Sequence, residues 1–283
     1  MSGARTKVAV IQMTSTEAVE DNLRALERLV RAAAEDRATL VVVPECFAYL
    51  GSDTAGMTSP GKVAVAEPLP EGGPILARCA ALATALGVEL VLGGFWERST
   101  EPRKVRNACV HLDAAGRVVS VYRKIHLFDV DLPDGTKLEE SASVERGSEV
   151  VVSDTRFGKL GLSVCYDLRF PELYRAHVDR GAIALAVPAA FTLTTGKDHW
   201  HVLLRARAIE AQSYVLAAAQ TGRHSATRQS YGHALIVDPW GTVLAECGEG
   251  EGYAAAWVDP DVVARVRRSL PSLAHRRLRG RDS

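Results

Sequence analysis

The sequence predicts an α/β fold in which helices cover the faces of β-sheets. Two patterns predict it: short aliphatic runs alternate with amphipathic helical segments, and some neighbouring runs are joined by short turn sequences. The first pattern favours parallel strands and the second favours hairpins, so we expect mixed connections. The chain has 283 residues, of which 47% are hydrophobic and 24% charged, enough for a large core without disulfides.

The N-terminal third supplies the first strands and a helix. Residues 8–11 are typical of a buried strand, and residues 14–16 offer caps for a helix that follows. The apolar positions of that helix recur every three or four residues, at Val19, Leu23, Leu26, Val30 and Ala33. Residues 40–43 form a second buried strand, which stops at Pro44.

The next segment continues the alternation and then changes to a hairpin. A helix begins with Pro74 in its first turn and ends before Gly87, and a strand follows over residues 88–96. Two further strands form a hairpin around a four-residue turn, over residues 108–112 and 118–122.

The C-terminal half begins with a long polar loop over about 129–148, in which Pro133, Gly135 and Gly147 interrupt regular structure. Long loops in compact domains are often functional. Strands and helices then alternate over residues 159–164, 171–180, 183–187, 198–212 and 214–219. A hairpin, a strand and a helix complete the prediction, over residues 234–246, 254–258 and 261–270.

A single domain is predicted over residues 1–283, because no linker, low-complexity tract or fixed-period repeat divides the chain. Its core covers about 7–260, and a C-terminal helix with an arginine-rich tail covers about 261–283. The tail is expected to be a solvated end, or to dock on the body or on a second subunit; its arginines are Arg276, Arg277, Arg279 and Arg281.

Charge and cysteine content exclude several classes of protein. The 34 basic residues balance the 34 acidic ones, which argues against nucleic acid or an anionic membrane as the main partner. The five cysteines are an odd number and widely scattered, a pattern typical of reduced thiols in a cytosol. Neither a signal peptide nor a bilayer-spanning stretch is recognisable, so we expect a cytoplasmic protein.

Reactive side chains follow the ends of several predicted strands, where a rigid backbone can present them to a cleft. Glu45 comes directly after a buried strand, Lys124 ends the hairpin, and Cys165 stands where a strand gives way to a turn. The helix that begins at Pro171 is a feature that can activate a cysteine nearby. Each residue has a plainer alternative: Cys165 as a small core residue, Glu45 as an exposed strand end, and Lys124 as a solvent-facing cation.

Metal and nucleotide sites are not predicted. His199 and His201 lie two residues apart, so on a helix they point in different directions and make a poor metal pair. Gly93 and Gly94 are followed by Phe95 and Trp96, which is not a phosphate-binding pattern. We therefore expect no metal and no organic cofactor.

Three sequence blocks carry a family resemblance. They are Pro44-Glu45, then Arg123-Lys124 with His126 and Phe128, then Val164-Cys165-Tyr166-Asp167 with Arg169-Phe170-Pro171-Glu172-Leu173. Through these blocks the chain resembles the nitrilase (carbon–nitrogen hydrolase) superfamily from Val8 to about Arg277. The resemblance implies a four-layer αββα sandwich that dimerises, so we expect a homodimer or a higher homo-oligomer.

Within the superfamily, the segments 199–210, 222–224 and 237–242 resemble the Nit branch of amidases. This likeness implies hydrolysis of a small 2-oxo acid amide, with deaminated glutathione giving 2-oxoglutarate and cysteinylglycine as the specific expectation. The alternatives are ω-amidase action on 2-oxoglutaramate or 2-oxosuccinamate, a non-catalytic scaffold subunit, and a redox-sensing thiol protein. One departure is His201, where these branches commonly carry Glu.

The resemblance implies a catalytic set of Glu45, Lys124 and Cys165 with a second carboxylate at Glu140. In that set the Cys165 thiol attacks the amide and Glu45 takes its proton as general base. Lys124 stays an ammonium between the two carboxylates, and with the backbone N–H of Tyr166 it forms an oxyanion hole.

Substrate contacts are expected from three further side chains. Arg169 or Arg223 would grip a substrate carboxylate, because a bidentate guanidinium suits that task; the alternative is a structural ion pair. Phe191 would pack at the pocket wall or in the core.

Overall fold

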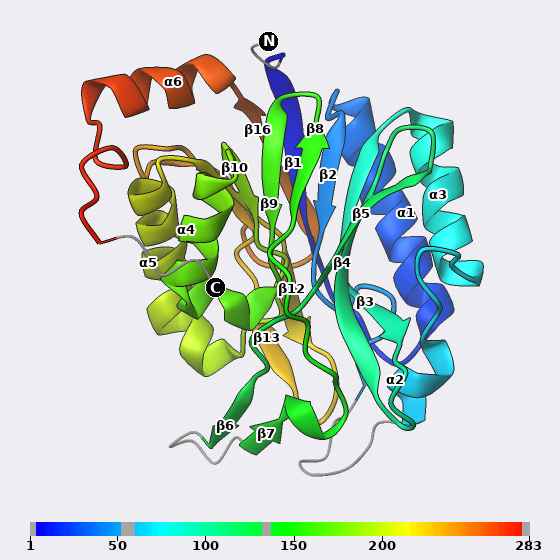
Figure 1. Ribbon diagram of the computed structural model, residues 1–283. Helices are drawn as coiled ribbons and strands as arrows, with labels where there is room; N and C mark the ends of the chain where they lie inside the picture. The colour runs from blue at the N-terminus through cyan, green and yellow to red at the C-terminus, as the bar shows by residue number, and fades with distance from the viewer. Residues whose placement is uncertain (1–3, 52–59, 132–136, 279–283) are drawn as a thin grey trace.

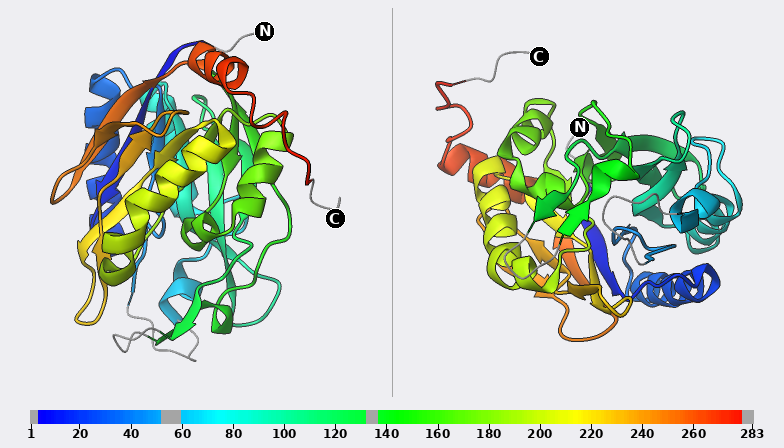
Figure 2. Two further views of the ribbon diagram at one scale, coloured as in Figure 1. Left: turned by 90° about the vertical axis from the view of Figure 1, so that its left-hand side faces the viewer. Right: turned by 90° about the horizontal axis from the view of Figure 1, so that it is seen from below.

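Two β-sheets lie face to face between two layers of helices in the computed structural model of the chain, which describes residues 4–51, 60–131 and 137–278. Figures 1 and 2 show α4 and α5 on the outer side of one sheet and α1 on the outer side of the other. This arrangement confirms the predicted α/β class and the four-layer αββα sandwich.

The larger sheet is built around β1 (Thr6–Met13). β1 pairs parallel with β2 on one edge; on its other edge it pairs antiparallel with β16 and then parallel with β12. The other members of this sheet are β2 (Leu40–Val43), β3 (Glu89–Arg98), β4 (Val105–Leu112), β5 (Val118–Arg123), β12 (Ala219–Arg223), β13 (Gln229–Tyr231) and β16 (Gly252–Val258).

The smaller sheet has the strand order β15-β14-β11-β10-β9-β8. Their bounds are β8 (Val152–Thr155), β9 (Gly158–Leu162), β10 (Ala184–Ala186), β11 (Tyr214–Ala217), β14 (Leu235–Val237) and β15 (Val243–Glu246). A separate hairpin pairs β6 (Asp129–Asp131) with β7 (Lys137–Glu139).

α1 and α3 cover the outer face of the larger sheet and α4 and α5 that of the smaller one, whereas α2 and α6 lie near opposite ends of the sandwich (Figure 1). The helices are α1 (Val19–Glu35), α2 (Pro60–Val65), α3 (Pro74–Leu86), α4 (Pro171–Asp179), α5 (Leu193–Ala211) and α6 (Pro260–Ser269), with single turns η1 (Glu140–Ala142) and η2 (Cys165–Arg169). Among the described residues, no helix is both long enough and apolar enough to cross a membrane.

The central strands are apolar on both faces because each face packs on another layer. In β1, Val8 and Val10 belong to the core that includes the smaller sheet, whereas Ala9 and Ile11 pack in the core that includes α1 and α3. This explains why β1 shows a continuous apolar run in the sequence and not an alternating one.

Four predicted elements differ from the structure. The strand expected over 214–219 is two strands: Ala217 pairs with Leu235 in the smaller sheet, and Ala219 pairs with Gln12 in the larger one. The loop expected over 129–148 contains the β6–β7 hairpin and η1, and its residues 132–136, with Pro133 and Gly135, lie outside the described residues.

Helix starts account for the other two differences. The helix expected at residue 198 begins at Leu193, because the Thr192 side chain accepts a hydrogen bond from the Thr195 N–H and caps it there. α1 begins at Val19 after Ala18, so residues 14–16 do not cap it.

The C-terminal segment docks on the body as far as it is described. α6 begins after Asp259, whose side chain accepts a hydrogen bond from the Asp261 N–H. Arg276 forms an ion pair with Asp179 at 2.8 Å, whereas Arg279 and Arg281 lie outside the described residues.

Candidate active site

Residues from both sheets converge at one end of the sandwich. Glu45 follows β2 and Lys124 follows β5 in the larger sheet, whereas Cys165 follows β9 in the smaller sheet and opens η2. All three side chains are buried, and they line one cavity together with Glu140. The structure therefore brings together the four residues that the sequence suggested as a catalytic set.

The Lys124 ammonium lies between two carboxylates. Its Nζ is 3.1 Å from Glu45 Oε1, and 3.0 and 2.8 Å from the two oxygens of Glu140. Glu140 is itself held by the backbone N–H of Phe128, which donates to its Oε2 at 2.7 Å. Two negative charges thus surround one positive charge, which fixes the ammonium and leaves little freedom in its position.

Cys165 is held in a strained turn. Its φ of 49° lies in the left-handed region, and its N–H donates to Pro188 O at 2.9 Å. The thiol, only 9% exposed as a residue, donates a hydrogen bond to the Glu45 carboxylate. Backbone strain of this kind occurs at functional sites where the surrounding structure fixes one conformation.

The protonation states follow from burial and neighbouring charge. Burial disfavours a charged Glu45, but the Lys124 ammonium and hydrogen bonds from Cys165 and Asn107 outweigh it, so the pKa of Glu45 is lowered. Burial and the Glu45 carboxylate raise the pKa of the Cys165 thiol well above its usual value. Burial acts against the Lys124 ammonium, yet Glu140 and Glu45 raise its pKa well above its usual value.

The resting site consequently holds a thiol, a carboxylate and an ammonium. The thiolate that a nearby helix start favours is not the resting form, because burial and the Glu45 charge raise the thiol pKa. Attack on a substrate thus requires a base, and the Glu45 carboxylate accepts the hydrogen bond of the thiol.

Asn107 and Ala190 complete the surroundings of Glu45, and sequence reasoning missed both. Asn107 Nδ2 donates to Glu45 Oε1 at 2.9 Å and to Glu140 Oε1 at 3.2 Å, and the Ala190 N–H donates to Glu45 Oε2 at 3.0 Å. A single amide in the apolar strand β4 was a signal for Asn107, because a buried polar side chain needs partners. A backbone donor such as Ala190 leaves no such signal.

Asp167 links the second and third sequence blocks. Its carboxylate, fully buried, accepts hydrogen bonds from Tyr122 OH at 2.7 Å and from His126 Nδ1 at 2.7 Å. It also accepts the Val164 N–H at 2.9 Å. The turn that carries Cys165 is thereby fixed to the segment that carries Lys124.

The empty space in the cavity, with open solvent at its mouth included, is about 670 Å³. Lys62 and Arg228 contribute cationic groups to its lining. An adjoining hollow of about 230 Å³ is lined by Tyr166, Arg169 and Phe191 as well as by Cys165. Three of the four suggested substrate-binding residues therefore lie at the site.

Arg223 is the exception. It is exposed at the end of β12, and its Nη1 donates to Ala226 O at 3.0 Å, away from both hollows. Arg228 lines the cavity, and Arg223 does not, because the chain turns back after Arg223. In this turn the His224 N–H donates to Arg228 O at 2.9 Å. Sequence reasoning did not single out Arg228, since this tight turn has no marker other than polar residues.

Comparison with known proteins identifies related sequences along most of the chain. The family described as carbon-nitrogen hydrolase matches residues 7–268. A deaminated glutathione amidase from Homo sapiens is 46% identical over 95% of this chain and 82% of its own length. The protein of the same name from a Synechocystis strain is 44% identical over 95% of this chain and 97% of its own length.

A solved structure shows the same fold. The Caenorhabditis elegans NitFhit protein superimposes with a TM-score of 0.90 at 39% sequence identity, covering 98% of this chain. This chain spans 66% of that longer protein.

Proposed function

The chain belongs to the carbon–nitrogen hydrolase family, and we propose that it hydrolyses the γ-amide of deaminated glutathione, giving 2-oxoglutarate and cysteinylglycine. It is an amide hydrolase of the Nit branch. The observation that carries the amide-hydrolase chemistry is the contact of a buried thiol with the Glu45 carboxylate in a cavity that also holds the Lys124 ammonium. The choice of substrate rests on the 44–46% identity to proteins named deaminated glutathione amidase.

Acylation begins when Cys165 Sγ attacks the amide carbonyl carbon while Glu45 takes the thiol proton. The carbonyl oxygen becomes an oxyanion, which the Lys124 ammonium and the Tyr166 N–H stabilise. When the C–N bond breaks, Glu45 gives its proton to the departing amine. Cysteinylglycine leaves, and a 2-oxoglutaryl thioester remains on Cys165.

Deacylation repeats the same proton transfers with water. Glu45 takes a proton from a water molecule, whose oxygen attacks the thioester carbonyl carbon. Breaking the C–S bond returns the proton to Cys165 and releases 2-oxoglutarate. Glu140 keeps the Lys124 ammonium in position through both halves of the reaction, because it holds Nζ with both oxygens.

Anionic groups of the substrate match the cationic groups of the cavity. Deaminated glutathione carries a carboxylate at each end, and Lys62, Arg169 and Arg228 line the two hollows that share Cys165. We assign carboxylate binding to Arg169 and Arg228, since a guanidinium binds a carboxylate with two parallel hydrogen bonds.

Substrate preference is the first test. Purified protein should cleave deaminated glutathione with a higher kcat/KM than 2-oxoglutaramate. The assays measure released cysteinylglycine for the first substrate and released ammonia for the second. A clear preference for 2-oxoglutaramate would replace the proposal with an ω-amidase. Equal turnover of both would leave the amidase class intact and remove the specific substrate.

The nucleophile is the second test. Cys165→Ala should abolish hydrolysis, and mass spectrometry of the wild-type protein during turnover should detect a 2-oxoglutaryl adduct on Cys165. Unchanged hydrolysis in Cys165→Ala would mean that another residue is the nucleophile. No turnover of any amide, with reversible oxidation of Cys165 by peroxide, would favour a redox-sensing thiol.

A homodimer and a cytoplasmic location belong to the same proposal. Ile209 of α5 lies against Gly241, next to the exposed Trp240, and an apolar patch of this kind suits a second copy of the chain. Sedimentation analysis checks the dimer, and Trp240→Glu should shift it towards monomer. The five described cysteines are all free, as in reducing compartments.

A further inference from the structure

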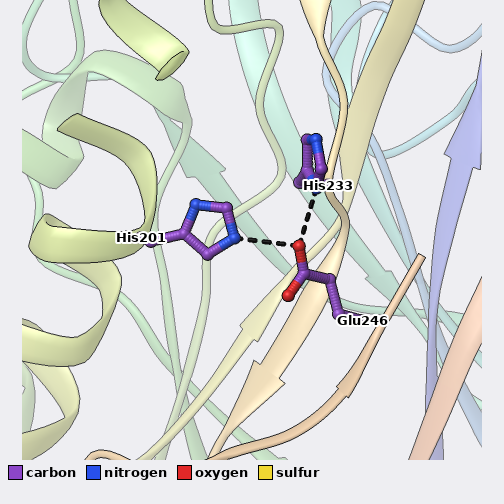
Figure 3. Close-up of side chains that lie close together, drawn as sticks. All are labelled: His201, His233 and Glu246. Carbon is purple, nitrogen blue, oxygen red and sulfur yellow. Dashed lines mark hydrogen bonds and ion pairs between the residues drawn. The ribbon is translucent and has the colours of Figure 1, made fainter. Parts of the chain in front are cut away.

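Two histidines and a glutamate meet on the outer side of the smaller sheet (Figure 3). Glu246 Oε1 lies 2.9 Å from His201 Nε2 and 2.6 Å from His233 Nδ1, and all three atoms lie within 4.8 Å of one another. None of the three lines the cavity around Cys165. The arrangement is therefore separate from the proposed catalytic site.

We propose that His201, His233 and Glu246 form a binding site for a divalent transition-metal cation, with Zn²⁺ as the best match. Two imidazole nitrogens and one carboxylate oxygen are a donor set that Zn²⁺ takes in proteins, with a water as the fourth ligand. The three side chains are 33%, 32% and 34% exposed, so an ion and its water can reach the donor atoms from solvent.

The three donors are set by separate elements that are each anchored. His201 lies in α5, and Glu246 lies at the end of β15, paired with Leu235 of β14. His233 precedes β14 in a left-handed conformation with φ of 60°. Trp200, the residue before His201 in α5, donates from Nε1 to His233 O at 2.8 Å. The site is thus present before any ion binds.

Small movements suffice to admit the ion. Tetrahedral Zn²⁺ with bonds of about 2.0–2.1 Å holds its ligand atoms roughly 3.3 Å apart. The donor atoms that now share hydrogen bonds at 2.9 and 2.6 Å need to separate by about half an ångström in this geometry. The two ring nitrogens lie within 4.8 Å of each other and must adjust to the same spacing. The ligand nitrogen of each ring must be the one without a proton, so the ion replaces the hydrogen bonds that His201 Nε2 and His233 Nδ1 now make to Glu246.

A bound ion would tie α5 to the β14–β15 hairpin through coordinate bonds. Trp200, next to His201, packs against Phe191 with ring centroids 4.9 Å apart. The site would therefore stabilise α5, which contributes Thr195 to the lining of the adjoining hollow, without supplying a group to the reaction.

The test is Zn²⁺ binding by tag-free protein in a Cys165→Ser background, which removes the thiol that lines the catalytic cavity as a competing ligand. Calorimetry at neutral pH should give one equivalent of bound Zn²⁺, and Co²⁺ should show the visible absorption of a tetrahedral complex. His201→Gln and Glu246→Gln should each weaken Zn²⁺ binding at least about tenfold. Zn²⁺ should raise the Tm of the parent protein and not of these variants.

His199→Gln is the matched control, because His199 is exposed on the same helix two residues away. It should bind Zn²⁺ like the parent protein. Equal affinity in the parent and in His201→Gln would overturn the site, as would a parent protein that binds no equivalent of Zn²⁺. Since every readout is binding or stability, the result is independent of whether deaminated glutathione is the substrate.

Discussion

At the residue scale, the central question is which group holds the proton before the reaction starts. The lowered pKa of Glu45 and the raised pKa of Cys165 place that proton on sulfur. The hydrogen bond between the two groups places Glu45 where the proposed reaction needs a base, in direct contact with the thiol proton. The pH dependence of the reaction distinguishes this arrangement from one with a resting thiolate.

We expect kcat/KM to be flat through neutral pH and to fall only when the pH drops below the ordinary range of a glutamate. Protonation of Glu45 removes the base, and its lowered pKa places that loss at unusually low pH. A resting thiol whose pKa is raised gives no increase near pH ~8.5, the ordinary value for cysteine. A pH profile of kcat/KM checks this, and an increase through that range would indicate a reactive thiolate.

Asn107→Ala should lower kcat/KM by about 10²-fold and move its acidic limb to higher pH. The Asn107 amide donates to Glu45 and helps to lower the pKa of that carboxyl, so its loss leaves the carboxylate easier to protonate. The pH profile of the variant measures both effects.

Asn22→Ala is the control for this substitution. The Asn22 amide is also buried, but it donates to the backbone oxygens of Thr16 and Ala48. The Asn22→Ala substitution should reduce the free energy of unfolding and leave the acidic limb of the kcat/KM profile in place. An acidic limb that moves equally in both variants would contradict a positioning role for Asn107.

At the element scale, the ends of strands explain why the catalytic candidates were visible in the sequence. Glu45, Lys124 and Cys165 each follow an apolar run whose strand the structure confirms. The register of the strands was not visible. In β3, the register with β4 shifts between Leu92 and Phe95. The Gly93-Gly94 pair did not reveal that the backbone of Glu45 and Cys46 packs closely against Gly94.

Gly94→Ala should reduce kcat/KM by at least tenfold. Gly94 has a φ of 59°, and a Cβ there would lie 2.3 Å from Cys46 N and 2.6 Å from Glu45 Cγ. The backbone carrying Glu45 would have to shift, and small shifts of a catalytic group carry large losses in rate. Steady-state kinetics and urea unfolding of the variant measure the two consequences.

Gly87→Ala provides the comparison, because Gly87 caps α3 with a φ of 65° and has nothing within 4 Å of its added Cβ. Both substitutions cost about 1 kcal/mol for the left-handed conformation. Only Gly94→Ala should lose activity. If Gly87→Ala lost as much, backbone strain alone and not the displacement of Glu45 would be the cause.

At the scale of the whole molecule, the chain passes from one sheet to the other next to the site. β11 ends in the smaller sheet at Ala217 and β12 begins in the larger one at Ala219. From β12, Gln220 Nε2 donates to Glu45 O at 2.9 Å. A pattern of apolar residues predicts each strand but not the sheet it joins, because both sheets bury the same kinds of side chain.

The same limit applies to side chains that reach the site from a distance. Arg228 lines the cavity through a turn that follows β12, whereas Arg223 in the recognisable Gly-Arg-His stretch faces away. Sequence patterns identify residues whose chemistry is unusual for their position. They do not identify ordinary surface residues that the global fold turns inward.

The final prediction concerns how the C-terminal helix is attached to the sandwich. Arg267 of α6 donates from Nε to Gln212 O at 3.2 Å, and from Nη2 to Ala182 O at 2.9 Å and Ser213 Oγ at 3.0 Å. Burial lowers the pKa of this guanidinium, so its hydrogen bonds are made in a site poor in water.

Arg267→Ala should therefore reduce the free energy of unfolding by about 2 kcal/mol, because it leaves carbonyl groups near the α5 C-terminus without their charged donor. The neighbouring Arg268 is exposed, and Arg268→Ala should change stability by no more than about 0.5 kcal/mol. Urea unfolding at one fixed protomer concentration measures both, since dimerisation would make stability depend on concentration. Because α6 contributes no residue to the cavity, kcat/KM should stay unchanged in both variants. A matching loss of stability in the two variants would mean that α6 is held by its apolar face and not by Arg267.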